Sequence, residues 1–186
     1  RAPPAAHPVL VLRREVPAHR DGHRARPCSW GTVPLITTQT GRTSYLLKDP
    51  TRYGTETRDA KNRLTESFSS GTPITSTTDT WGGNGAVSSR VSAAVDAQYG
   101  ITKTLDFYQK TFGRKGIENN SRGAKGMVHF GNRIANAFWD PACGCMLYGD
   151  GDGGMFPPKP LVALDVTGHE LTHGVVDAPR SWNPPA

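Results

Sequence analysis

Hydrophobic and polar positions follow a strand-like pattern over much of the chain. Two runs of β-branched and aromatic residues, 32–38 and 43–47, are split by a glycine and predict two strands joined by a turn. Residues 50–87 are rich in Thr, Ser, Gly and Asp, which indicates short strands and long surface loops. Two further apolar runs, 127–130 and 135–139, resemble strands of an antiparallel sheet.

A helical period replaces this pattern over 91–112. Apolar residues recur there at alternating spacings of three and four, which predicts one long amphipathic helix. The aromatic positions of this stripe, Tyr108 and Phe112, are expected in the core. Gln98 and Gly100 interrupt the stripe, because neither residue is apolar and bulky.

Both ends of the chain differ from its centre. Residues 1–30 are dominated by Arg, Ala, Pro and His without a period that could bury a face, so we expect them to be disordered. The tail, 178–186, has a similar composition, with Arg, Pro and Trp. The globular domain is therefore expected over 31–177. A chain of 186 residues with 35% hydrophobic composition can form one such domain with a buried core.

The formal charge of +6 is concentrated in the first segment. Residues 1–30 hold six Arg against two acidic residues, which leaves 16 of the 22 basic and 14 of the 16 acidic residues for the rest of the chain. A net charge of +2 there gives no reason to expect a nucleic-acid partner. No apolar window is long enough to span a membrane, and the apolar run 9–12 is too short for a signal peptide.

Three cysteines do not form a disulfide framework. Cys143-Gly144-Cys145 either closes a small ring in an oxidising compartment or remains as two loop thiols. Only the first alternative favours secretion.

A second helix is predicted over 163–177, ended by Pro179, and it carries the sequence His169-Glu170-Leu171-Thr172-His173. Residues four apart share one helix face, so both imidazoles can reach one zinc ion at roughly 2.0–2.1 Å. A carboxylate next to the first His can then take a proton from an attacking water. This pattern is typical of zinc peptidases.

Several other segments, together with this motif, resemble the thermolysin-like neutral metalloproteases. They are Tyr45-Leu46-Leu47-Lys48-Asp49, Ala94-Val95-Asp96-Ala97, Asp106-Phe107-Tyr108, Phe112-Gly113-Arg114, Val128-His129-Phe130, Asn136-Ala137-Phe138-Trp139, 148–153 and Asp165-Val166-Thr167-Gly168-His169. The resemblance covers about four fifths of the chain and implies an α+β fold, in which a β-rich N-terminal lobe with a long helix is closed by a terminal active-site helix.

The resemblance implies a role for each matching residue. His169 and His173 correspond to the first and second zinc ligands, and Glu170 corresponds to the catalytic carboxylate. Asn136 and Ala137 match the edge strand along which the family's peptide substrates lie, a form of β-augmentation.

Calcium is a second cofactor that the resemblance implies. Asp165 matches a calcium ligand of the family, and carboxylates suit calcium, which takes six to eight oxygen ligands. Near Asp79 the family has further acidic ligands. Thr77 and Thr78 stand there instead of a carboxylate, which argues against a calcium site in that loop.

The resemblance stops at both end segments. In the family a later Glu completes the zinc coordination, a later Tyr and His stabilise the oxyanion, and a helical lobe forms the other wall of the cleft. Residues 178–186 supply none of these, so we expect a truncated catalytic domain without its third ligand. The abrupt change of composition also suggests that both ends are read from shifted frames, or that the sequence is the product of a damaged gene.

Two functions follow from these expectations. The first is a secreted, monomeric zinc endopeptidase that acts on peptides or proteins. The alternative is a catalytically inactive fragment that serves as a binding domain or has no function.

Four other features have structural explanations that we weigh against functional ones. His129 is expected to be a structural strand histidine that is hydrogen-bonded in the sheet. Asp177 is expected to be a helix-surface carboxylate rather than a substitute zinc ligand, and Trp139 a packing residue. The Gly-Asp loop at 148–153 is equally compatible with tight turns and with ion binding.

Overall fold

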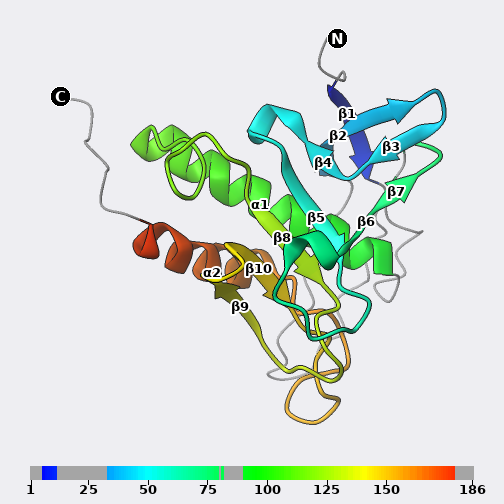
Figure 1. The fold of residues 1–186 in the computed structure, drawn as a ribbon, viewed down its shortest axis with the longest axis vertical. Helices are drawn as coiled ribbons and strands as arrows, with labels where there is room; N and C mark the ends of the chain where they lie inside the picture. Colours follow the sequence, from blue (N-terminus) through cyan, green and yellow to red (C-terminus); the bar gives the residue numbers. More distant parts are fainter. Residues whose placement is uncertain (1–5, 12–32, 80, 82–89, 179–186) are drawn as a thin grey trace, which may run out of the picture.

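The structure, a computed structural model, describes residues 6–11, 33–79, 81 and 90–178 and contains two sheets and two long helices (Figure 1). The first sheet has the strand order β1-β2-β3-β7, with β1 (Ala6–Val11), β2 (Val33–Gly41), β3 (Ser44–Leu46) and β7 (Thr75–Ser76). The second has the order β4-β5-β8-β10-β9, and β6 also pairs with β5. Its strands are β4 (Lys48–Asp49), β5 (Thr55–Asp59), β6 (Thr72–Pro73), β8 (Lys125–Val128), β9 (Ala137–Asp140) and β10 (Cys145–Tyr148).

The helices are α1 (Arg90–Phe112) and α2 (Leu164–Asp177), with short 3-10 turns η1 (Pro50–Arg52) and η2 (Phe68–Ser70). Both long helices coincide with the predicted segments, and β2 and β3 coincide with the first two predicted strands. The α+β fold class is therefore confirmed. No helix in the described part of the chain is both long and apolar enough to cross a membrane.

The prediction that residues 1–30 are disordered is wrong for Ala6–Val11. This segment forms β1, which pairs antiparallel with β2 from Ala6 opposite Thr38 to Val11 opposite Val33. β1 lies at the edge of its sheet, where a proline such as Pro8 is tolerated because one side of the strand needs no hydrogen bonds. The rest of the predicted disordered segment, and the tail from 179 onward, lie outside the described residues.

The prediction of an antiparallel sheet around β8 and β9 is also wrong. These two strands are separated by β10, which pairs parallel with β8 and antiparallel with β9, and β8 is also parallel to β5. The sequence did not reveal β10, because Cys145-Met146-Leu147-Tyr148 is buried at every position and so lacks polar alternation.

β10 is buried on both faces because successive residues in a strand point to opposite sides. Cys145 and Leu147 belong to a small cluster with Met127 and Phe130 on one side of the sheet. Met146 and Tyr148 belong to the main core on the other side, which includes buried residues of α1 and Leu171 of α2. In Figure 1 the two helices lie next to each other, with β8, β10 and β9 beside them.

Gln98, which interrupts the apolar stripe of α1, attaches this helix to β5. The side chain is fully buried. Its Nε2 donates to the carbonyl of Thr55 at 3.0 Å, and its Oε1 accepts from the Thr57 hydroxyl at 2.6 Å. The polar residue therefore satisfies groups that would otherwise be buried without partners.

Gly100, the second interruption, is where α1 meets α2. A Cβ atom built on it would lie 3.0 Å from three atoms of Thr167, which is tighter than ordinary contact. The missing side chain lets the two helices approach closely.

The prediction that Tyr108 and Phe112 lie in the core is wrong. Phe112 is 42% exposed, and Tyr108 is only half-buried. Their rings contact each other on an open surface, with centroids 5.9 Å apart, and do not enter the core.

Gly174 plays the same part between α2 and β9. A Cβ atom there would lie 2.7–2.9 Å from three ring atoms of Trp139, so one face of the indole packs directly on the helix backbone. Tyr148 of β10 adds a hydrogen bond from its hydroxyl to Thr167 Oγ1 at 3.1 Å. Burial raises the pKa of Tyr148 above its ordinary value, so this hydroxyl stays protonated and can donate.

Replacing Gln98 should destabilise the fold strongly. We expect Gln98→Ala to lower the free energy of unfolding by about 2–4 kcal/mol, because it leaves a cavity and two unsatisfied groups on β5. Urea unfolding measures this change. The matched control Gln109→Ala alters an exposed position of the same helix and should change stability by less than about 0.5 kcal/mol. Equal effects of the two substitutions would contradict the assignment.

Two glycines of α2 should respond differently to the same substitution. Gly174→Ala should destabilise by about 1–3 kcal/mol, because a rigid ring and a helix backbone must separate. Gly168→Ala should be neutral or stabilise by up to about 1 kcal/mol, because alanine favours helix and its Cβ would meet only Thr104 Oγ1 at 3.8 Å. Thermal unfolding of both variants tests this, and a stabilised Gly174→Ala would refute the close packing.

Candidate metal centre

His169, Glu170 and His173 converge on one side of α2. The Nε2 atoms of the two histidines lie 3.3 Å apart. Glu170 Oε1 lies 3.9 Å from His169 Nε2, and Glu170 Oε2 lies 4.0 Å from His173 Nε2. In the described part of the chain, this is the single group of three or more side chains that could share a metal ion.

The separation of the two nitrogens fits zinc. Two nitrogens at about 2.0–2.1 Å from one ion, at a tetrahedral angle, stand about 3.3–3.4 Å apart. The imidazoles therefore need little rearrangement to hold an ion between them. The side chains of His169 and His173 are 70% and 59% exposed, so the ion's remaining positions would face outward. Imidazole is among zinc's common ligands, so the donor set fits this metal as well.

Glu170 is less exposed than the histidines, at 19%, and its carboxylate is directed toward the sheet. Its Oε2 accepts a long hydrogen bond, 3.4 Å, from the backbone amide of Trp139 in β9. The carboxylate is thus held between the two imidazoles and the edge strand. A water or a peptide bond at this place would be within reach of both the metal donors and a base.

β9 is a free edge in the described structure, where it pairs only with β10. Backbone groups of successive residues in a strand point to opposite sides. The Trp139 amide points away from β10, toward Glu170, so the backbone N–H and C=O of Ala137 point to the same free side. Ala137 can therefore offer a donor and an acceptor to an added peptide strand.

Asn136 lies immediately before β9. Its backbone carbonyl accepts from the Gly149 amide at 2.9 Å, so this group is already used within the sheet. Its side chain is exposed. The structure thus places Asn136 and Ala137 at the same edge as Glu170. The Asn136 side chain is exposed, and the Ala137 backbone points to the free side of β9 although the residue itself is buried.

The other predicted ligands lie apart from this centre. Asp165 is exposed in the first turn of α2 and joins no group of potential metal ligands among the described residues. Its calcium role stays a prediction. Asp79 Oδ1 accepts from Thr37 and from the Trp81 indole, at 2.7 and 3.3 Å. Asp177 is exposed and lies outside the metal cluster, in agreement with the surface role expected for it.

His129 is buried and makes structural hydrogen bonds, but it lies just after β8 and not within a strand as predicted. Its Nδ1 lies 2.7 Å from Asp150 Oδ1, and its Nε2 lies 3.2 Å from the carbonyl of Arg90 at the start of α1. Asp150 also accepts from Asn62. In the same Gly-Asp loop, Asp152 Oδ1 accepts the amides of two following residues, 154 and 156. Both carboxylates are thus engaged in local hydrogen bonds, which favours the structural interpretation of this loop.

Two features of the site were not evident from the sequence. Gly174 stands five residues after His169, yet nothing in the motif explains a glycine in mid-helix; its contact with Trp139 does. Cys143 and Cys145 form a disulfide, which resolves the alternative that the sequence left open. The sequence did contain an indication of the role of Gly174, because a glycine inside a helix lowers its stability and therefore suggests that close packing requires it.

Comparisons with known proteins agree with this geometry. The family model described as thermolysin metallopeptidase, catalytic domain, matches residues 24–177. The transglutaminase-activating metalloprotease of Streptomyces mobaraensis is 44% identical over 148 residues, which are 80% of this chain and 18% of that protein. Neutral protease NprE of Bacillus pumilus is 40% identical over 147 residues, which are 77% of this chain and 45% of that protein.

A solved structure is also similar. The precursor of protealysin, a metalloproteinase from Serratia proteamaculans, matches with a TM-score of 0.51 and 31% identity over 66% of this chain and 34% of its own. The chain therefore spans less than half the length of each of these three proteins. The family match begins before the predicted start of the domain and ends at its predicted end, residue 177. With this match over most of its length, the chain belongs to the thermolysin metallopeptidase family.

Proposed function

We propose that this chain provides the active-site helix and N-terminal lobe of a zinc-dependent endopeptidase. The observation that carries the proposal is the 3.3 Å separation of the His169 and His173 Nε2 atoms, with the Glu170 carboxylate beside both. Membership of the thermolysin metallopeptidase family supports the same metal and the same reaction.

The chemistry divides between the metal and the chain. Zinc held by His169 and His173 supplies a Lewis acid that polarises a carbonyl and lowers the pKa of water. Glu170 takes a proton from the attacking water as the new C–O bond forms. It then delivers that proton to the amine nitrogen as the peptide C–N bond breaks.

The substrate is an extended peptide added to the free edge of β9. Ala137 supplies backbone hydrogen bonds, and the exposed side chain of Asn136 supplies an amide beside them. Because Glu170 accepts from the Trp139 amide, this arrangement aligns the peptide backbone with the catalytic carboxylate. We expect no nucleic-acid partner and a monomeric protein.

We also propose that the protein acts outside the cell. The Cys143–Cys145 disulfide supports this location, because disulfides persist in oxidising compartments.

Zinc binding and hydrolysis should separate in substitutions of the motif. Glu170→Gln should keep the zinc but reduce hydrolysis of casein by about 10²–10⁴-fold, the usual contribution of a general base. His169→Ala should weaken zinc binding by about a hundredfold or more, since even indirect partners of a metal ligand contribute about 10- to 100-fold. Metal analysis of the dialysed protein and a casein assay measure the two effects.

The control is Asp177→Asn, which neutralises an exposed carboxylate on the same helix and should change neither quantity. Wild-type protein that retains no zinc would overturn the metal assignment. Zinc binding with equal hydrolysis in wild type and Glu170→Gln, or with none in either, would refute catalysis by this chain and favour a binding role.

A further inference from the structure

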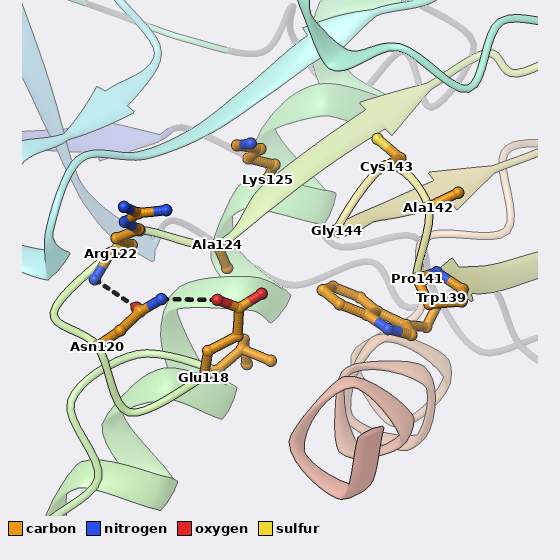
Figure 2. Close-up of a pocket in the computed structure, with 12 residues that line it drawn as sticks. Glu118, Asn120, Arg122, Ala124, Lys125, Trp139, Pro141, Ala142, Cys143 and Gly144 are labelled. Carbon is orange, nitrogen blue, oxygen red and sulfur yellow. Dashed lines mark hydrogen bonds between the residues drawn. The ribbon is translucent and has the colours of Figure 1, made fainter. Parts of the chain in front are cut away.

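A pocket of about 250 Å³ lies at the end of the sheet where β9 ends and β8 and β10 begin (Figure 2). Trp139, the β9–β10 turn at 141–144 and the segment 117–125 line it. None of the three metal-cluster residues contributes to its wall. The volume is below the roughly 300–1,000 Å³ typical of sites for small molecules, so it suits a side chain better than a whole metabolite.

Trp139 joins this pocket to the active-site helix. One face of its indole rests on Gly174 of α2, and its ring also lines the pocket. The backbone amide of the same residue donates to Glu170. The pocket therefore shares Trp139 with the strand that contacts Glu170.

Glu118 faces the indole from the opposite wall. In Figure 2 its carboxylate lies between Asn120 and Trp139. Oε2 accepts a hydrogen bond from Asn120 Nδ2 at 2.6 Å, and Asn120 Oδ1 in turn accepts from the Arg122 backbone amide at 3.0 Å. This chain of hydrogen bonds holds the carboxylate in place, while no ion pair to Glu118 occurs within the described residues.

The two cationic residues of the lining do not neutralise this end of the pocket. The ammonium of Lys125 lies 5.6 Å from the ring centre of Phe68, a residue outside the pocket. Figure 2 shows Arg122 beyond Asn120, on the side away from Trp139. The charge that faces the indole is therefore negative.

We propose that this pocket binds a lysine or arginine side chain of the peptide substrate. The Glu118 carboxylate attracts the cation through its charge, and the Trp139 ring offers apolar surface to the aliphatic stem that carries the cation. This assignment rests on the proposed function, because it uses the same edge of β9.

Binding of paired peptides tests the assignment without turnover. The full chain carrying Glu170→Gln and loaded with zinc is titrated with fluorescent octapeptides in which one lysine is moved along an otherwise apolar sequence. Norleucine in place of lysine gives a reference with the same aliphatic stem and no charge. At one lysine position we expect affinity roughly threefold to fivefold above the norleucine peptide, measured by fluorescence anisotropy.

Glu118→Gln should reduce that preference to less than about twofold, since only the carboxylate charge is lost. Glu66→Gln, which removes an exposed carboxylate outside the pocket, should leave it intact. Equal affinity for lysine and norleucine peptides at every position, including no measurable affinity for either, would overturn the assignment. A preference for the lysine peptide that is unchanged in Glu118→Gln would also overturn it. Zinc-dependent hydrolysis without this preference would refute the pocket alone, whereas the preference without zinc binding or hydrolysis would refute the proposed function alone.

Discussion

Contact between α2 and β9 is the constraint on which the site depends. Gly174 has no side chain, so the indole of Trp139 lies directly on the helix and fixes the helix at the edge of the sheet. The same approach brings Glu170 within reach of the Trp139 amide. A base on a helix and a free strand edge are thereby held in one geometry, and such preorganisation is what lets a positioned carboxylate act on a bound peptide.

The interior supports this contact by leaving few buried groups unsatisfied. Gln98 and the hydroxyls of Thr57 and Tyr148 each find partners across element boundaries, and these bonds connect α1, α2 and the sheet. The metal donors His169 and His173, in contrast to these buried side chains, are largely exposed. Rigid, buried contacts on one side of α2 thus support reactive, accessible groups on the other. This division is expected for a site that must bind an ion and admit a polymer.

Sequence patterns predicted the elements that carry a strong period and failed where burial was complete. The apolar stripe of α1 and the runs that form β2 and β3 were recognisable because each element has one buried face. β10 was missed because both of its faces are covered, and the parallel pairing of β8 was missed with it. β1 was missed for another reason: Ala6–Val11 is short and interrupted by Pro8, and only pairing with β2 makes it a strand.

The sequence by itself determined the metal donors, because four-residue spacing on a helix places His169 and His173 on one face whatever surrounds them. It also determined the family, through residues at the edge strand and around the motif. Only the tertiary structure decided which backbone groups of β9 face outward, and that Glu118 stands opposite Trp139 across a pocket. These facts depend on contacts between segments far apart in the chain, and no local period encodes such contacts.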